Sequence, residues 1–190
     1  MSAPRSVHYA ANLGILQYVK GTLFHGLFFS SHSSLTLQVY SGVDWAGDPT
    51  DRRSTTGFLF LLGDSLISWR SKKKTVVARS STEAEYRALA DSTSELLWLR
   101  WLLHDMGVPQ PLSTPLYCDN HSTVQIAHND VFHECTKHIE IDCHFVRQHL
   151  QDGTLRLLSV PSADIFTKAH PPGRHRALVF KLQMSSLIPP

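Results

Sequence analysis

Apolar residues recur along the chain at two different spacings, and these spacings predict its elements. Near the N-terminus they follow helical spacing up to Gly21, which predicts an amphipathic helix over residues 5–20 with Gly21 as its C-cap. After a serine-rich turn come short segments rich in Val, Leu, Phe and Trp, separated by turn residues. They cover residues 35–41, 55–62, 65–70 and 74–79. This second pattern predicts an antiparallel meander.

The spacing becomes helical again from Thr82. Apolar residues then recur every three to four positions until Gly107 and Pro109, so we predict a long helix over residues 82–103 and expect Trp98 and Trp101 to lie in the core. A short apolar segment, 115–119, follows this crossover and is expected to be a parallel strand. The remaining pattern predicts helices near 122–128 and 137–151, a strand at 154–160 and a helix from about Ala163.

Together these elements predict an α/β fold. Its sheet is mixed and five-stranded, with three antiparallel meander strands and two parallel strands, and helices flank it. The length of 190 residues and the 42% hydrophobic content suit one domain of this kind with a short appendage.

Composition narrows the functional class. The formal net charge is only +2, so any nucleic-acid surface must be local rather than spread over the whole molecule. Three cysteines, an odd number, argue against a disulfide framework and for a reducing compartment. The sequence shows no signal-like start and no apolar stretch long enough to span a bilayer, so we expect a soluble, intracellular protein without a membrane partner.

Several carboxylates fall at the ends of the predicted elements, where they could converge on metal ions. Hydrolysis of a phosphodiester by two divalent ions needs three or four such groups, because Mg²⁺ prefers oxygen ligands. Each also has a purely structural interpretation: Asp119 could cap the helix after it, Glu83 or Glu85 could complete a capping box, and Asp164 could oppose a helix dipole. The candidates are Asp44, Glu83, Glu85, Asp119 and Asp164.

Five segments, taken in order, resemble the ribonuclease H domain of copia-type LTR retrotransposon Pol polyproteins. They are YSGVDWAGDPTDRRSTTGF, ISWRSKKKTVVARSSTEAEY, LYCDN, TKHIEIDCHFVR and ADIFTK. The resemblance covers about residues 35–170 and implies a ribonuclease H-like fold. It further implies that residues 1–34 are a remnant of the reverse-transcriptase connection and that residues 171–190 are the C-terminal tail of the polyprotein.

By this resemblance, Glu85, Asp119 and Asp164 match the carboxylates that hold Mg²⁺ or Mn²⁺, and His138 matches a histidine that could assist proton transfer or product release. The first-strand aspartate of the family is missing, because Gly42 stands in its place. Asp44, on the same strand face, is a candidate substitute, although two residues of strand span about 6.6 Å. The loop before Asp164 is also shorter than is usual in the family.

Basic residues gather in the meander with two tryptophans nearby, which suits a groove that follows the phosphates of an RNA/DNA hybrid; a solvated hairpin with edge-protecting lysines is the alternative. These residues are Arg52, Arg53, Arg70, Lys72, Lys73 and Lys74. The spacing of Cys135, His138, Cys143 and His144 is not that of a zinc knuckle or finger.

The resemblance therefore implies an enzyme that hydrolyses the RNA strand of RNA/DNA hybrids. Because of Gly42 we expect this activity to be weak or absent. The alternatives are a catalytically dead domain that still binds hybrid and an unselected genomic relic. The implied ancestral partner is an upstream reverse-transcriptase region, and the implied location is a cytoplasmic virus-like particle.

Overall fold

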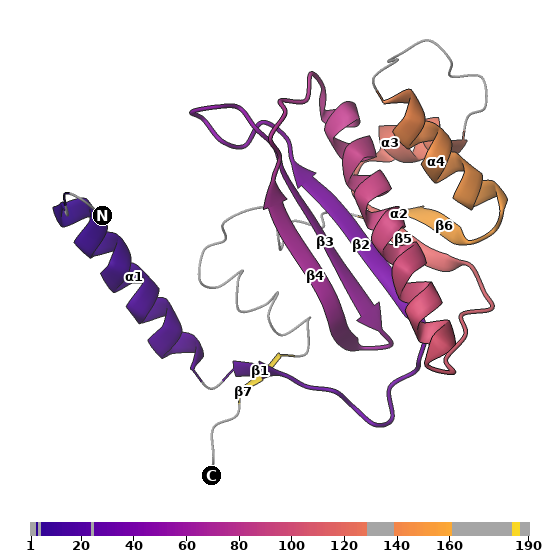
Figure 1. Ribbon diagram of the computed structural model, residues 1–190, viewed down its shortest axis with the longest axis horizontal. Coiled ribbons are helices and arrows are strands. Elements are labelled where there is room, and N and C mark those ends of the chain that lie inside the picture. The colour runs from indigo at the N-terminus through magenta and orange to yellow at the C-terminus, as the bar shows by residue number, and fades with distance from the viewer. Residues whose placement is uncertain (1–2, 4, 24, 129–138, 161–183, 187–190) are drawn as a thin grey trace.

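The computed structural model describes residues 3, 5–23, 25–128, 139–160 and 184–186. Its centre is a five-stranded sheet of strand order β4-β3-β2-β5-β6 (Figure 1). The strands are β2 (Leu37–Asp44), β3 (Thr55–Leu62), β4 (Ser65–Lys73), β5 (Thr114–Cys118) and β6 (Leu155–Ser159). β2, β3 and β4 pair antiparallel, and β5 and β6 add in parallel beside β2. The predicted mixed sheet is confirmed.

One strand prediction was wrong. Residues 74–79 do not form a strand of their own, since β4 runs on to Lys73 and an irregular segment then leads to α2. Val76 and Val77 are each about half exposed, so their β-branched side chains are not buried in a sheet face. The segment is held instead at Ala78, whose carbonyl accepts a hydrogen bond from the Trp45 indole at 3.1 Å.

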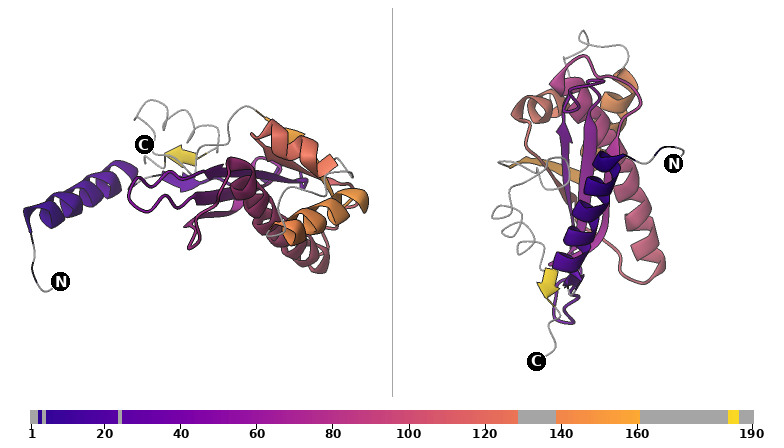
Figure 2. Two further views of the ribbon diagram at one scale, coloured as in Figure 1. Left: turned by 90° about the horizontal axis from the view of Figure 1, so that it is seen from above. Right: turned by 90° about the vertical axis from the view of Figure 1, so that its left-hand side faces the viewer.

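The long helix α2 (Ser81–Asp105) covers one face of the sheet, and α4 (Glu140–Gln151) lies beside it on the same side (Figure 2). The Ser80 hydroxyl caps the start of α2 by accepting a hydrogen bond from the Glu83 amide at 3.1 Å. At its end the amide of Gly107 bonds His104 O and the amide of Val108 bonds Leu103 O, the pattern of a Schellman motif. Gly107 has a φ of +81°, which explains a glycine at this position.

The core lies between α2 and the sheet. Phe60, Leu37 and Val39 from the strands meet Tyr86 and Leu89 from the helix, all fully or almost fully buried. Alternation along β2 therefore points its odd-numbered residues toward α2. The even-numbered positions of β2, Gly42 among them, face the other side of the sheet.

Trp98 and Trp101 do not lie in this core. Their exposed fractions are 51% and 62%, so the prediction that placed them inside was wrong. The neighbouring Leu96, Leu99 and Leu103 occupy the buried stripe of α2 instead. Helical spacing allows both sets of residues, and only the orientation of the helix on the sheet distinguishes them.

Four shorter elements complete the described chain. α1 (Ser6–Thr22) stands apart from the sheet in Figure 1 and buries no residue; it continues through Gly21, so the predicted C-cap was wrong and Leu23 takes that role. β1 (His25–Leu27) pairs antiparallel with β7 (Met184–Ser186). α3 (His121–His128) follows β5. The helix expected from Ala163 and the start of the helix expected from 137 lie outside the described residues.

None of the described helices combines the length and the apolar character needed to cross a membrane.

Candidate active site

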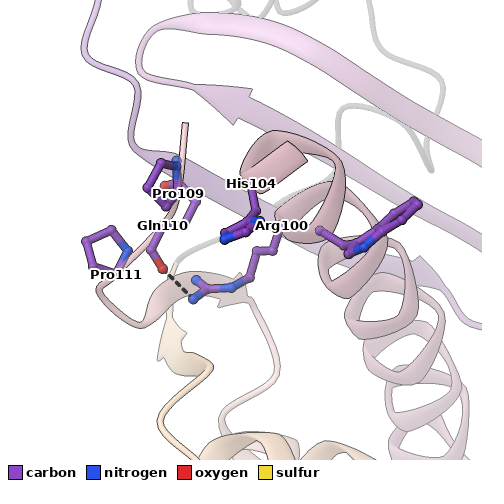
Figure 3. Close-up of a pocket in the computed structure, with 6 residues that line it drawn as sticks. Arg100, His104, Pro109, Gln110 and Pro111 are labelled. Carbon is purple, nitrogen blue, oxygen red and sulfur yellow. Dashed lines mark hydrogen bonds between the residues drawn. The ribbon is translucent and has the colours of Figure 1, made fainter. Parts of the chain in front are cut away.

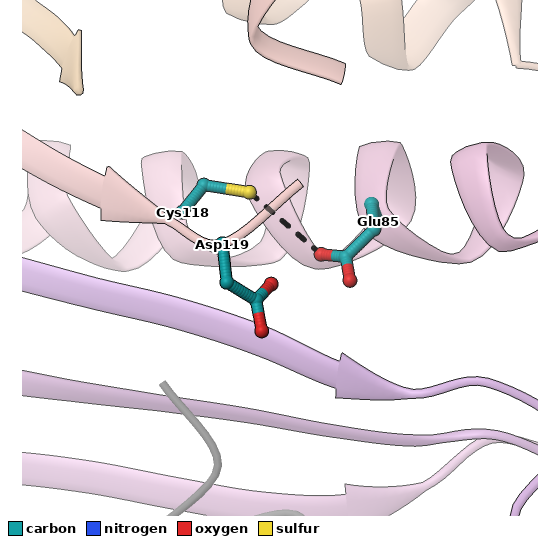
Figure 4. A group of neighbouring side chains, drawn as sticks. All are labelled: Glu85, Cys118 and Asp119. Atoms are coloured by element: carbon teal, nitrogen blue, oxygen red, sulfur yellow. Dashed lines mark hydrogen bonds between the residues drawn. The ribbon is translucent and has the colours of Figure 1, made fainter. Parts of the chain in front are cut away.

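Two acidic side chains and a thiol converge where β5 ends beside the first turns of α2 (Figure 4). One ligand atom from each of Glu85, Cys118 and Asp119 lies within 4.8 Å of the others. This is the one such group of acidic, histidine and cysteine side chains within the part of the chain that the structure describes. The carboxyl end of a parallel strand is the usual place for ligands in α/β sheets.

Capping does not explain the acidic members. In the capping contacts of α2 it is Glu83 that takes part: its amide bonds Ser80, and its carboxylate accepts a hydrogen bond from the amide of Arg79 at 2.7 Å. Glu85, only 5% exposed, lies on the sheet side of the helix instead. At the start of α3 the Asn120 side chain, not Asp119, accepts the hydrogen bond from the Thr123 amide, at 3.0 Å. The structural interpretations of Glu85 and Asp119 as caps are therefore wrong.

Cys118 was not among the site residues expected from the sequence. Its thiol donates a hydrogen bond to Glu85 Oε2 at 3.8 Å and accepts one from the Asn120 amide at 3.5 Å. Burial, followed by the charge of Glu85, raises the pKa of this thiol to about 12, so it stays protonated and able to donate. Alternation in β5 could have revealed it, because a residue pointing from this strand end toward α2 must meet the helix near Glu85.

A buried pair of hydroxyls lies close behind this group. Ser92 on α2 donates to Ser41 Oγ on β2 at 2.9 Å, and both residues are fully buried. Ser41 is also the register partner of Cys118 across the parallel β2–β5 pair. The contact therefore joins α2 to β2 directly beside the strand end that carries the site.

Gly42 is next to this strand end. Since Ser41 pairs with Cys118, the following residues Gly42 and Asp119 lie at neighbouring positions at the carboxyl ends of β2 and β5. Adjacent strands are about 4.8 Å apart, so a carboxylate at position 42 would be within reach of a metal ion held by Asp119. Glycine offers no side-chain ligand there.

Asp44 lies outside the group that Glu85 and Asp119 form. Its carboxylate packs against the turn that follows β2: a Cβ added at Gly47 would come within 1.9 Å of Asp44 Oδ2. The carboxylate is thus directed along the chain toward residue 47. Asp164 and His138, the other residues expected at the site, lie outside the described residues.

The basic residues of the meander have several acidic neighbours. Lys73 forms ion pairs with Asp48 and, at 2.9 Å, with Asp51. A hydrogen bond from Lys73 is the largest cause that lowers the pKa of Asp48 to about 2. Lys74 pairs with Asp91 on α2, and Arg53 lies 3.6 Å from Asp51.

Arg52, Arg70 and Lys72 differ from these residues. They are exposed, and among the described residues they form no ion pair. Arg70 and Lys72 lie on the edge strand β4, opposite Phe58 and Thr56 of β3, and so share the sheet face that α2 covers.

A separate hollow of about 320 Å³ lies at the other end of α2, lined by Arg100, Trp101, His104, Pro109, Gln110 and Pro111 (Figure 3). The Arg100 guanidinium donates to Gln110 O and Leu112 O and to Thr114 Oγ1, so it ties the loop before β5 to the helix. Along α2, Glu85 is fifteen residues from Arg100, which is about 22 Å. This hollow is therefore not part of the acidic site.

No family model matches the chain. It is 43% identical over 164 residues to the retrovirus-related Pol polyprotein from transposon RE2 of Arabidopsis thaliana, and 36% identical over 172 residues to that from transposon TNT 1-94 of Nicotiana tabacum. These alignments cover 86% and 88% of this chain. The chain belongs to the Pol polyproteins of copia-type retrotransposons. It spans only 11% and 13% of the lengths of these two relatives.

Solved structures give the fold of this Pol segment. The structure of LC11-RNase H1, a protein isolated from compost, superposes with a TM-score of 0.51, covering 78% of this chain and 92% of the LC11-RNase H1 chain. The structure of LC11-RNase H1 in complex with an RNA/DNA hybrid superposes with a TM-score of 0.50, covering 66% of this chain and 86% of that one. Sequence identities are 14% and 12%, so the likeness establishes a ribonuclease H-like fold and nothing finer.

Proposed function

We propose that this Pol segment is a ribonuclease H domain whose ancestral reaction is two-metal hydrolysis of the RNA strand of RNA/DNA hybrids, and that hydrolysis is impaired here. The observation that carries the proposal is the convergence of Glu85 and Asp119 at the end of β5, with Gly42 at the neighbouring position of β2. The first part of this arrangement fits a nuclease of this fold. The second part removes one of its ligands.

The donor set suits a divalent ion. Carboxylate oxygens are the ligands that Mg²⁺ and Mn²⁺ prefer, and Glu85 and Asp119 bring theirs within 4.8 Å of each other. Bound ions would supply the positive charge that stabilises the attacking and leaving oxygens of a phosphodiester. Glu85 and Asp119 would hold one ion, with Asp164 a further ligand by family resemblance. An aspartate at position 42 would be a further oxygen ligand, and glycine offers none.

A surface for the hybrid is also proposed on β4. Arg70 and Lys72 are exposed cations on an edge strand, and phosphates could approach them without displacing a carboxylate. Lys73 and Lys74 would first have to leave their ion pairs with Asp48 and Asp91. The proposed phosphate contacts therefore depend mainly on Arg70, Lys72 and the exposed Arg52.

The test is Mg²⁺- and Mn²⁺-dependent cleavage of a labelled RNA/DNA hybrid by the chain and by Gly42→Asp. We expect slow cleavage by the chain and a rate at least about 100-fold higher for the variant, which is the scale of one positioned electrostatic group. Gly57→Asp is the matched control, because Gly57 pairs with Gly42 from β3, on the side away from β5. It adds the same charge to the same sheet face, one strand further from Asp119, and should restore nothing.

Glu85→Gln in the Gly42→Asp background should remove the recovered activity, since it takes away a proposed ligand. If Gly42→Asp binds hybrid but cleaves no faster than the chain, Gly42 is not the cause of impairment. A catalytically inactive domain that binds hybrid is then the better description, and the shortened loop before Asp164 becomes the next feature to test. Absence of hybrid binding at low salt as well would favour an unselected relic.

Asp44 remains a candidate substitute for the missing aspartate. Its carboxylate is directed toward Gly47 rather than into the acidic group, which argues against this role. Asp44→Asn decides the question: if it abolishes cleavage by the otherwise unchanged chain, Asp44 has taken over. We expect it to leave any residual rate unchanged within a few-fold.

We further propose that residues 1–34 belong to the connection from an upstream reverse-transcriptase region, which acts within a cytoplasmic particle. α1 carries large exposed apolar residues over most of its circumference, more than the predicted amphipathic pattern implies. Among them are Tyr9, Ile15, Leu16 and Tyr18, each more than 60% exposed. A helix with so much apolar surface is normally buried among other elements. The connection ends close to the sheet, because Leu27 packs against Leu59 and Leu66 on the face opposite α2.

A further inference from the structure

The acidic site contains a sulfur atom, and sulfur changes which ion it prefers. Mg²⁺ and Mn²⁺ are hard ions that take oxygen ligands, whereas thiolates bind softer ions such as Zn²⁺ and Cd²⁺ far more strongly. Cys118 is fully buried and directs its Sγ at Glu85 (Figure 4). The site thus offers one soft and two hard ligand atoms to an ion.

The spacing of these atoms agrees with a tetrahedral ion. With a Zn–S bond of about 2.3 Å and a Zn–O bond of about 2.0 Å, a tetrahedral angle puts sulfur and oxygen about 3.5 Å apart. The observed distance from Cys118 Sγ to Glu85 Oε2 is 3.8 Å, and Asp119 completes the set within 4.8 Å. The shorter distance would have to change by a few tenths of an ångström, and the longer ones by up to about 1.5 Å, to bring all three atoms into coordination.

We propose that this site binds one thiophilic divalent ion of the Zn²⁺ class through Cys118 Sγ and one oxygen each of Glu85 and Asp119. The thiol releases its proton to solvent as the sulfur–metal bond forms, and no oxidation or reduction takes place. Water fills the remaining position, as in open zinc sites. The ion occupies the ligands that the proposed nuclease needs for Mg²⁺, so it acts as an inhibitor of that activity.

The binding claim is independent of catalysis, and only the inhibitory role rests on the proposed function. Position 42 has no part in the binding, so Gly42 does not weaken it. Cys143, the other described cysteine, is half-buried on α4 and belongs to no group of three potential ligands among the described residues. It therefore serves as the comparison for Cys118.

The experiment uses the full chain with Cys135→Ser and Cys143→Ser, which leaves Cys118 as the sole cysteine. Cd²⁺ is added without nucleic acid, and its ultraviolet thiolate charge-transfer band is recorded. We expect a band that saturates at one ion per chain and disappears when Cys118→Ser is added. Glu85→Gln and Asp119→Asn should each weaken binding about 10-fold or more, because each removes a ligand. Circular dichroism of every variant establishes that it is folded.

Two results would overturn the inference. One is the absence of a band in the folded chain that retains Cys118, and the other is a band whose affinity is unchanged in both carboxylate variants, since Cys118 would then bind alone. Hybrid cleavage by Gly42→Asp, measured separately, tests the nuclease. Cd²⁺ binding without any cleavage refutes the proposed function and leaves this site standing, and cleavage without Cd²⁺ binding does the reverse. If both hold, Zn²⁺ should inhibit Gly42→Asp at least about 10-fold more strongly than the same variant carrying Cys118→Ser.

Discussion

Alkaline pH should destabilise this protein through the Cys118 thiol. In the folded chain, burial and then the charge of Glu85 raise the pKa of this thiol from 9.0 to about 12. Between these values the folded state keeps a proton that the unfolded state has released, so the free energy of unfolding falls as the pH rises. The loss is about 1.4 kcal/mol per pH unit, and therefore about 1.4 kcal/mol by pH 10. Solvent screens this electrostatic effect little, because Cys118 is fully buried.

Urea unfolding between about pH 8 and about pH 10 measures this loss in the chain and in Cys118→Ser, which removes the titrating group. Other groups also contribute, since burial raises the pKa of Cys143 to about 11 and raises that of Tyr86. The decisive quantity is thus the difference between the two proteins. The chain should lose about 1 kcal/mol more than Cys118→Ser over this range. Equal losses would refute a protonated thiol buried beside Glu85.

Three further predictions test the surface, the site and the core. Lys72→Ala should reduce the magnitude of the slope of log hybrid affinity against log salt concentration by about 0.7 to 0.9. Lys73→Ala should change this slope less, because Lys73 is already ion-paired. Hybrid binding measured at several salt concentrations tests both. Gly42→Asp should lower the melting temperature in a chelator, since it adds a third carboxylate near two others, and Mn²⁺ should reverse this loss in a thermal melt. Phe60→Ala should cost about 3 to 5 kcal/mol and Trp101→Ala less than about 1 kcal/mol in denaturant unfolding, because the first side chain is fully buried and the second is 62% exposed.

The sheet could be predicted from the sequence because its determinants are local. Short β-rich segments with turns between them specify a meander, and a helix between strands specifies a parallel addition, so three antiparallel and two parallel strands were expected. The helix α2 could also be predicted, since a cap at Ser80 and a glycine at Gly107 mark its ends. The exact bounds of the elements could not be predicted. For example, β4 continues for three residues beyond the predicted end at Arg70.

Features that depend on how elements pack could not be predicted in the same way. Trp98 and Trp101 have the spacing of core residues, yet α2 is rotated so that Leu96, Leu99 and Leu103 face inward. The contact between Cys118 and Glu85 joins residues 33 positions apart, and no local pattern encodes it. The acidic pair itself was predicted from family resemblance, and the structure adds the distance between its members.

The geometry also explains how a copia-type Pol domain could lose the aspartate that we propose for position 42 and keep its fold. The contacts that join β2 to α2 come from the odd-numbered face of the strand, where Ser41 meets Ser92 and Val43 packs with Ala84 and Ala88. Position 42 points to the opposite face, so its side chain contributes nothing to that packing. Removing a carboxylate from the neighbourhood of Glu85 and Asp119 even relieves repulsion when no ion is bound. Under the proposed function, folding and catalysis therefore make separate demands on neighbouring residues of one strand, and mutation at position 42 would affect catalysis without opposing folding.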